Sequence, residues 1–204
     1  MPSITMTRGA GGGGLSMSRQ KTLTGDSLLN CSKSLSAAKT GTLTTRTDAN
    51  TGTITAQSSH GITTGDKVCI FWDGGLRYDV TVGTVSGNSV PIDLGGGDNL
   101  PVATTTLTIM VQNAETNGWT FDGDDVVGFA CGASVPFVVL FKEGSTVTAA
   151  YYSADSDGDA HFYDSEETST VAANPLAGAA IDSIAFAHGS SAAAKTVSVL
   201  ALLN

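Results

Sequence analysis

Short runs of β-branched and aromatic residues, each bounded by Gly, Thr, Ser, Asn or Asp, recur along most of the chain, and no stretch sustains a helical period. The clearest runs are Lys67 to Trp72, Leu76 to Val85, Thr104 to Val111, Pro136 to Phe141, Thr146 to Tyr152 and Lys195 to Leu203. Short strands separated by turn residues are typical of β-sandwiches and β-barrels. The pattern therefore predicts an all-β fold of antiparallel sandwich or barrel units.

The pattern also divides the chain into three segments. Residues 1–40 are predicted to form an extended assembly arm, because the glycine run Gly11 to Gly14 cannot pack and the polar residues around it bury little. Within that arm, Ser27 to Lys39 is compatible with either a short helix or an extended strand. Residues 41–113 are predicted to form a small β-barrel or half-sandwich, and residues 114–204 a β-sandwich unit.

Composition adds that the chain folds and presents neutral surfaces. Of its 204 residues, 41% are hydrophobic and only 14% are charged, the opposite of a disordered chain. A surface made of Ser, Thr, Asn, Gly and Ala is buried against another copy at little desolvation cost, so copies of the same chain are the expected partners. The net charge of −9 argues against direct binding of nucleic acid, which requires clustered Lys and Arg.

Neither the cysteines nor the apolar runs indicate a metal site or a membrane segment. Cys31, Cys69 and Cys131 lack the C-x-x-C spacing of zinc ribbons, and the last two lie in apolar runs where burial is expected. Met1 to Arg19 lacks the apolar core of a secretory signal peptide, and no apolar run approaches the roughly 20 residues of a membrane helix. We therefore expect synthesis in the cytoplasm and no membrane partner.

One acidic segment has the spacing of calcium ligands. Asp155, Asp157, Asp159 and Glu166 occupy relative positions 1, 3, 5 and 12 of an EF-hand loop. Ala160 stands where such a loop requires Gly, and the flanking residues have strand rather than helix patterns. Calcium is the one cofactor candidate, and the favoured alternative is an Asp-Gly hairpin with a solvated acidic tip that binds no calcium tightly.

No pattern of catalytic residues stands out. The three histidines, His60, His161 and His188, are not part of any hydrolase or metalloprotease motif, so the chain is not expected to be an enzyme. A glycan-binding module is an alternative, since several aromatic residues could stack on sugar rings. These are Trp72, Tyr78, Trp119, Phe121, Tyr151, Tyr152 and Tyr163.

Apolar residues at both ends of the chain are the predicted subunit contacts. In the arm, Leu15, Met17 and Leu23 interrupt polar residues and are expected to pack on an adjacent subunit. In the last run, Leu200 and Leu202 make the end of the strand apolar on both faces. Such a strand has to be covered by another sheet or by a neighbouring copy.

Two turn-and-strand segments, His60 to Val68 and Val82 to Pro91, resemble segments of tailed-bacteriophage virion proteins, particularly those of the tail. The resemblance covers about Thr42 to Val111. It implies a structural subunit of a symmetric virion, tail tube or tail-associated, with other virion proteins as partners and with no catalytic residues. A capsid decoration protein is the alternative within that class.

Overall fold

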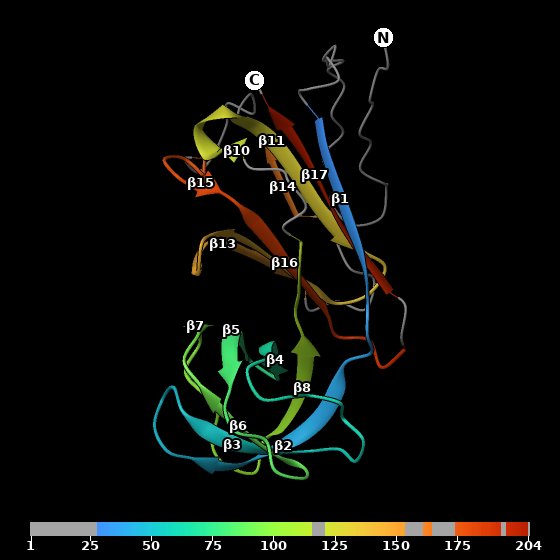
Figure 1. The fold of residues 1–204 in the computed structure, drawn as a ribbon, viewed down its shortest axis with the longest axis vertical. Helices are drawn as coiled ribbons and strands as arrows, with labels where there is room; N and C mark the ends of the chain where they lie inside the picture. The colour runs from blue at the N-terminus through green and yellow to red at the C-terminus, as the bar shows by residue number, and fades with distance from the viewer. Residues whose placement is uncertain (1–27, 116–120, 154–160, 165–173, 193–194, 204) are drawn as a thin grey trace.

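The computed structural model describes residues 28–115, 121–153, 161–164, 174–192 and 195–203, and in these residues the fold is all-β, as predicted. Figure 1 shows a barrel at one end of the molecule and a sandwich of two sheets at the other. The described residues contain no α-helix, and so no helix that could cross a membrane.

The barrel is closed by six antiparallel strands in the order β4-β8-β2-β3-β6-β5, with β5 pairing back to β4. The short β7 adds to β5 on the outside of this cycle. The strands are β2 (Lys39–Arg46), β3 (Gly52–Ala56), β4 (Lys67–Trp72), β5 (Gly75–Val82), β6 (Ser89–Asp93), β7 (Gly96–Gly97) and β8 (Thr106–Val111). Because the sheet closes on itself, the six strands leave no unpaired edge.

Alternation along each strand fills the barrel with branched side chains. Leu43, Ile54 and Ile109, from three different strands, are completely buried inside the barrel. The residues next to each of them in its own strand face outward. This period of two, already visible in the sequence, is the reason these segments form strands with one apolar and one polar face.

Arg77 closes one end of the barrel. Its register partner in β4 is the core residue Ile70, so its side chain enters the barrel from β5, where it is only 2% exposed. The guanidinium donates to Asn50 Oδ1 at 3.0 Å and to the backbone oxygens of Ala49, Gly95 and Asp98. These bonds tie two loops together across the barrel end.

The sandwich consists of two four-stranded antiparallel sheets. The outer sheet has the order β1-β17-β11-β14 and the inner sheet the order β13-β12-β16-β9. The outer strands are β1 (Leu28–Leu35), β17 (Lys195–Leu203), β11 (Val126–Ala133) and β14 (His161–Asp164). The inner strands are β13 (Thr146–Ser153), β12 (Phe137–Glu143), β16 (Ser183–His188) and β9 (Asn113–Glu115). A separate two-stranded sheet is formed by β10 (Phe121–Asp122) and β15 (Ala180–Ile181), and the 3₁₀ turn η2 (Gly123–Asp125) follows β10.

Strand β12 contacts both the outer sheet and the barrel, and so holds the outer sheet, the inner sheet and the barrel together. Phe137, Val139 and Phe141 pack into the core between the two sheets. The alternate residues Val138 and Leu140 pack against the barrel in a second cluster, which also contains residues of β4 and β8. The inner sheet is therefore buried on both faces, which is why this strand is a continuous apolar run in the sequence.

The predicted arm is shorter than the sequence indicated. Leu28–Leu35 is not part of an extended arm but forms β1, which pairs over its whole length with β17. Of the two conformations open for this segment, the strand is the one observed. Lys39 and Thr40 also belong to the folded body, because β2 begins at Lys39.

Candidate functional site

Two of the predicted interface residues, Leu200 and Leu202, lie on the outward face of β17. Val197, Val199 and Ala201 alternate with them and are buried in the sandwich core. Leu200 and Leu202 are half-buried within the single chain. The other predicted interface residues, Leu15, Met17 and Leu23, lie outside the described residues.

The neighbouring strand gives this outward face its shape. In β11, the register partner of Leu200 is Ala130 and that of Leu202 is Gly128. Paired residues in antiparallel strands share a face, so two leucines project beside positions with little or no side chain. We call Gly128, Ala130, Leu200 and Leu202 the outer apolar face. Since β17 is a central strand with partners on both sides, a contact here uses side chains and not unpaired backbone groups.

Asp155, Asp157, Asp159 and Glu166 lie outside the described residues. The strands before and after the first three are β13 and β14, which lie in opposite sheets and do not pair with each other. In the part of the chain that the structure describes, no three His, Cys, Asp or Glu residues gather as metal ligands would.

A buried ion pair, which the sequence did not reveal, joins the barrel to the sandwich. Lys142 Nζ of β12 lies 2.8 Å from Asp79 Oδ1 of β5, and the two side chains are 11% and 9% exposed. Lys67 of β4 approaches the same carboxylate at 3.6 Å but is 43% exposed. Asp79 adopts a φ of 56°, a left-handed conformation that Asp tolerates better than most residues.

Gln112 completes the surroundings of Asp79. With the side-chain amide oriented so that its oxygen and its nitrogen both have partners, Gln112 accepts from the Asp79 backbone N–H at 2.9 Å and donates to Asp79 Oδ1 at 3.3 Å.

The two buried cysteines are not reactive. Cys69 lies beside Gln112, and burial raises the pKa of its thiol to about 11. Cys131 is also buried, and its pKa is raised by the same cause. Both cysteines are thiols at neutral pH and not nucleophilic thiolates.

His60 and His188 each use both ring nitrogens in bonds to the backbone. In His60, Nδ1 accepts from the N–H of Ile62 and Nε2 lies 3.1 Å from the oxygen of Gly87. In His188, Nδ1 accepts from the N–H of Ser190 and Nε2 donates to the oxygen of Leu35. These bonds hold loops in place, so neither imidazole is positioned as a general base for a serine.

We expect His188 to make the fold sensitive to mild acid. Burial lowers the pKa of this imidazole below 6.5, Lys195 lowers it further, and the bond to Leu35 partly offsets both effects. The unfolded chain then binds the proton more readily, so stability is full above pH 7 and falls as the pH drops below about 6.5. Melting temperatures at pH 7 and pH 5 should differ less in His188→Gln, which can keep both hydrogen bonds. An equal drop in both proteins would contradict this role.

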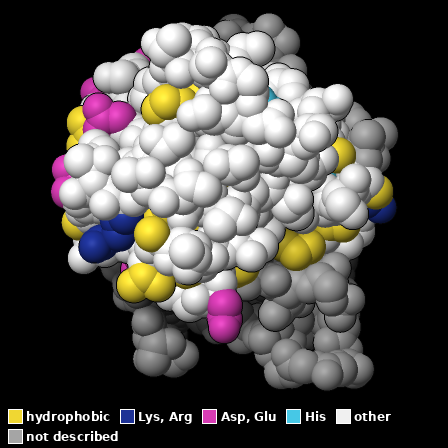
Figure 2. All heavy atoms as spheres, turned by 90° about the horizontal axis from the view of Figure 1, so that it is seen from below, with side chains coloured by type: hydrophobic (Ala, Val, Ile, Leu, Met, Phe, Trp, Pro, Cys, Tyr) yellow, Lys and Arg dark blue, Asp and Glu magenta, His cyan; other side chains and the backbone are white. Residues whose placement is uncertain are grey.

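The surface of the barrel end carries few charges. Figure 2 shows the barrel end from below, where most of the surface is backbone or uncharged polar side chain and the charged side chains lie toward the rim. Much of the uncharged character comes from Thr in β2, β3 and β8. The T-x-T pattern at Thr40 to Thr44, Thr53 to Thr55 and Thr106 to Thr108 is the sequence signal for this surface.

A scan against protein-family models, a search of curated proteins and a search of solved structures each found no match to this chain.

Proposed function

We propose that this protein is a structural subunit of a phage-like virion that assembles with copies of itself into a ring, tube or shell. Its place would be in the tail tube or associated with the tail. The alternative within the same class is a capsid decoration protein, which would bind to a shell formed by other virion proteins.

The outer apolar face is the observation that carries this proposal. A central strand of a soluble sheet normally alternates apolar and polar residues, as Thr196 and Ser198 do in the first half of β17. Leu200 and Leu202 break that alternation on the outward face, where both are half-buried beside Gly128 and Ala130. Apolar side chains next to a nearly flat strand fit a sheet or strand of a neighbouring subunit closely.

The buried ion pair between β5 and β12 supports the same proposal. A subunit that repeats around a ring has to present its contacts at a fixed angle, since small errors accumulate around the closed assembly. Lys142 and Asp79 join the sandwich to the barrel, and each of the two residues is more than nine-tenths buried. Such a pair favours one arrangement of barrel and sandwich over others.

We expect the double variant Leu200→Ser, Leu202→Ser to fold but to assemble poorly. Removing two half-buried leucines from a contact costs about 1 to 2 kcal/mol, which is roughly tenfold in the association constant of each contact. Sedimentation velocity over a range of concentrations should show a shift from assemblies to single subunits. The subunit should stay folded, with a melting temperature lower by about 4 to 8 °C because both leucines are half-buried in the subunit itself. Ser198→Thr, on the same face of the same strand, is the matched control. Assembly of the double variant at the wild-type concentration would contradict the proposal.

A further inference from the structure

Threonine side chains form an ordered array on the outside of the barrel. In the register, Thr40 of β2 lies opposite Thr108 of β8, and Thr42 lies opposite Thr106. On the other side of β2, Thr42 also pairs with Thr55 of β3. Three adjacent strands therefore carry hydroxyl groups in two rows, with neighbouring strands about 4.8 Å apart.

These hydroxyls face solvent. The residues that alternate with them, Gly41, Leu43, Ile54 and Leu107, are buried, and the last three belong to the barrel core. Thr40, Thr55 and Thr106 are exposed, and Thr42 is half-buried. Together with Gln57 they line a shallow hollow of about 230 Å³ that contains no charged side chain.

Several hydrogen-bonding groups in the hollow are held in position but unused. The Gln57 side-chain oxygen accepts from the backbone N–H of Thr40 at 2.8 Å and from its hydroxyl at 3.0 Å. That leaves the Gln57 amide NH₂ without a partner among the described residues. The hydroxyls of Thr42 and Thr106 also have no hydrogen-bond partner among the residues that the structure describes. A fixed amide donor with neighbouring hydroxyls suits a ligand that both donates and accepts hydrogen bonds.

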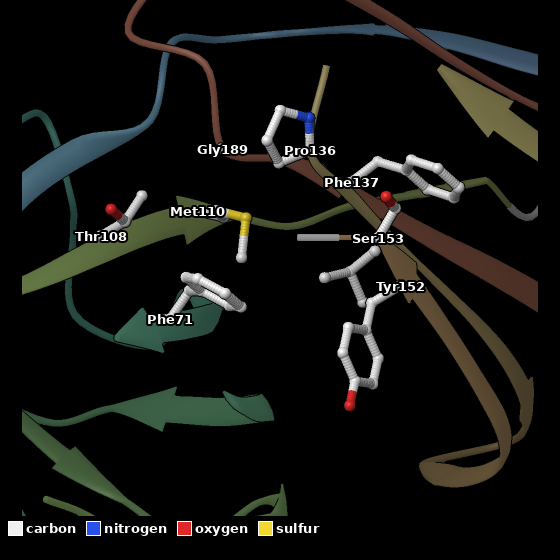
Figure 3. Close-up of a pocket in the computed structure, with 9 residues that line it drawn as sticks. Phe71, Thr108, Met110, Pro136, Phe137, Tyr152, Ser153 and Gly189 are labelled. Atoms are coloured by element: carbon white, nitrogen blue, oxygen red, sulfur yellow. The ribbon is translucent and has the colours of Figure 1, made fainter. Parts of the chain in front are cut away.

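An apolar crevice adjoins this array. Thr108, which pairs with Thr40, also lines a cavity of about 180 Å³ between the barrel and the inner sheet. Figure 3 shows Phe71 and Met110 on the barrel side of this crevice and Tyr152 on the sandwich side. Tyr152 is 45% exposed, a large value for an aromatic side chain that lines a cavity. Aromatic carbon thus lies next to the hydroxyl array.

We propose that the crevice and the threonine array form a binding site for a neutral glycan. Sugar rings have apolar C–H faces, which suit Phe71 and Tyr152, and hydroxyl edges, which suit Thr42, Thr106 and Gln57. The lining offers no cation to an anionic ligand, and the net charge of −9 repels acidic polymers. A second copy of the chain fits this surface less well, because the closed barrel has no strand edge to extend and the hydroxyls would need matching partners.

The experiment uses the full chain on an array of immobilised oligosaccharides, with neutral hexose and N-acetylhexosamine oligomers beside sialylated and uronic-acid oligomers. Binding of one or more neutral oligomers and none of the acidic ones is the expected result. Two variants are then measured by calorimetry with the neutral oligomer that the wild type binds most tightly: the double variant Thr42→Val, Thr106→Val and the single variant Tyr152→Ala. The affinity of each variant should be about tenfold lower than that of the wild type. Valine keeps the shape and the strand preference of threonine, so the fold is preserved. Thr146→Val, at the far end of β13 from Tyr152, is the matched control and should bind like the wild type.

Three results of the glycan-binding measurements would overturn the proposal. These are binding of no neutral oligomer by the wild type, preference for acidic oligomers, and neutral binding that the variants leave unchanged. If the threonine variant instead changes the size of the assembly without affecting any glycan, the surface is a contact between copies and the proposal is also wrong.

Discussion

Removal of Leu200 to Asn204 is expected to leave the protein insoluble or unfolded. The deleted part of β17 is bonded on both sides, to Leu28–Asn30 of β1 and to Val126–Ala130 of β11. Each lost half-buried leucine costs about 1 kcal/mol, and each lost ladder hydrogen bond about 0.5 to 1.5 kcal/mol. Loss of Ala201 also uncovers Phe129 and Val126 of the sandwich core. The total approaches the whole stability of a typical domain, about 5 to 15 kcal/mol.

Soluble yield and thermal melting measure this effect. The control is deletion of Asn204 alone, which removes no residue of β17 and should leave the melting temperature unchanged. A soluble five-residue truncation that melts with the wild type would mean that the end of β17 is dispensable, and the described pairing would be wrong.

Replacing Lys142 by Ala is expected to cause the second-largest loss, about 3 kcal/mol of unfolding free energy. The substitution leaves Asp79 buried with the more distant and half-exposed Lys67 as its remaining cation. For a chain of this length that loss corresponds to a melting temperature lower by about 6 to 12 °C. Chemical denaturation followed by tryptophan fluorescence gives the free energy directly.

Two further variants isolate the cause. Lys67→Ala removes the exposed partner of the same carboxylate and should cost less than about 1 kcal/mol. The pair Lys142→Met, Asp79→Asn removes both charges and keeps a residue that tolerates the positive φ, so it should regain most of the loss. If Lys142→Ala costs no more than Lys67→Ala, the ion pair does not join the two units as described.

Local alternation was enough to predict the all-β fold and several strands closely. β4 at Lys67–Trp72 and β17 at Lys195–Leu203 have the predicted bounds, because each is a strongly apolar run between turn residues. The sequence of β1 is compatible with a helix or a strand, since its polar composition gives no clear period. Its stability as a strand comes from β17, more than 150 residues later in the chain. Pairing over such a distance depends on tertiary packing that a local pattern does not contain.

The same limit applies to the sites. Lys142 and Asp79 are 63 residues apart. In the sequence Asp79 lies in the middle of one strand and Lys142 near the end of another, and nothing local links them. The outer apolar face was partly predictable, because Leu200 and Leu202 break the alternation of β17. The register that places them beside Ala130 and Gly128 was not predictable. The threonine array was visible as T-x-T repeats, but the order β8-β2-β3 that joins the repeats follows from closure of the barrel.

Electron microscopy of the purified full chain in negative stain tests the central claim most directly, with sedimentation velocity on the same sample. The proposal predicts rings, tubes or shells of one repeating size, or a fixed multimer, that disappear in the Leu200→Ser, Leu202→Ser variant. A wild-type protein that remains a single subunit at every concentration, and that associates with no virion particle, would contradict a structural role.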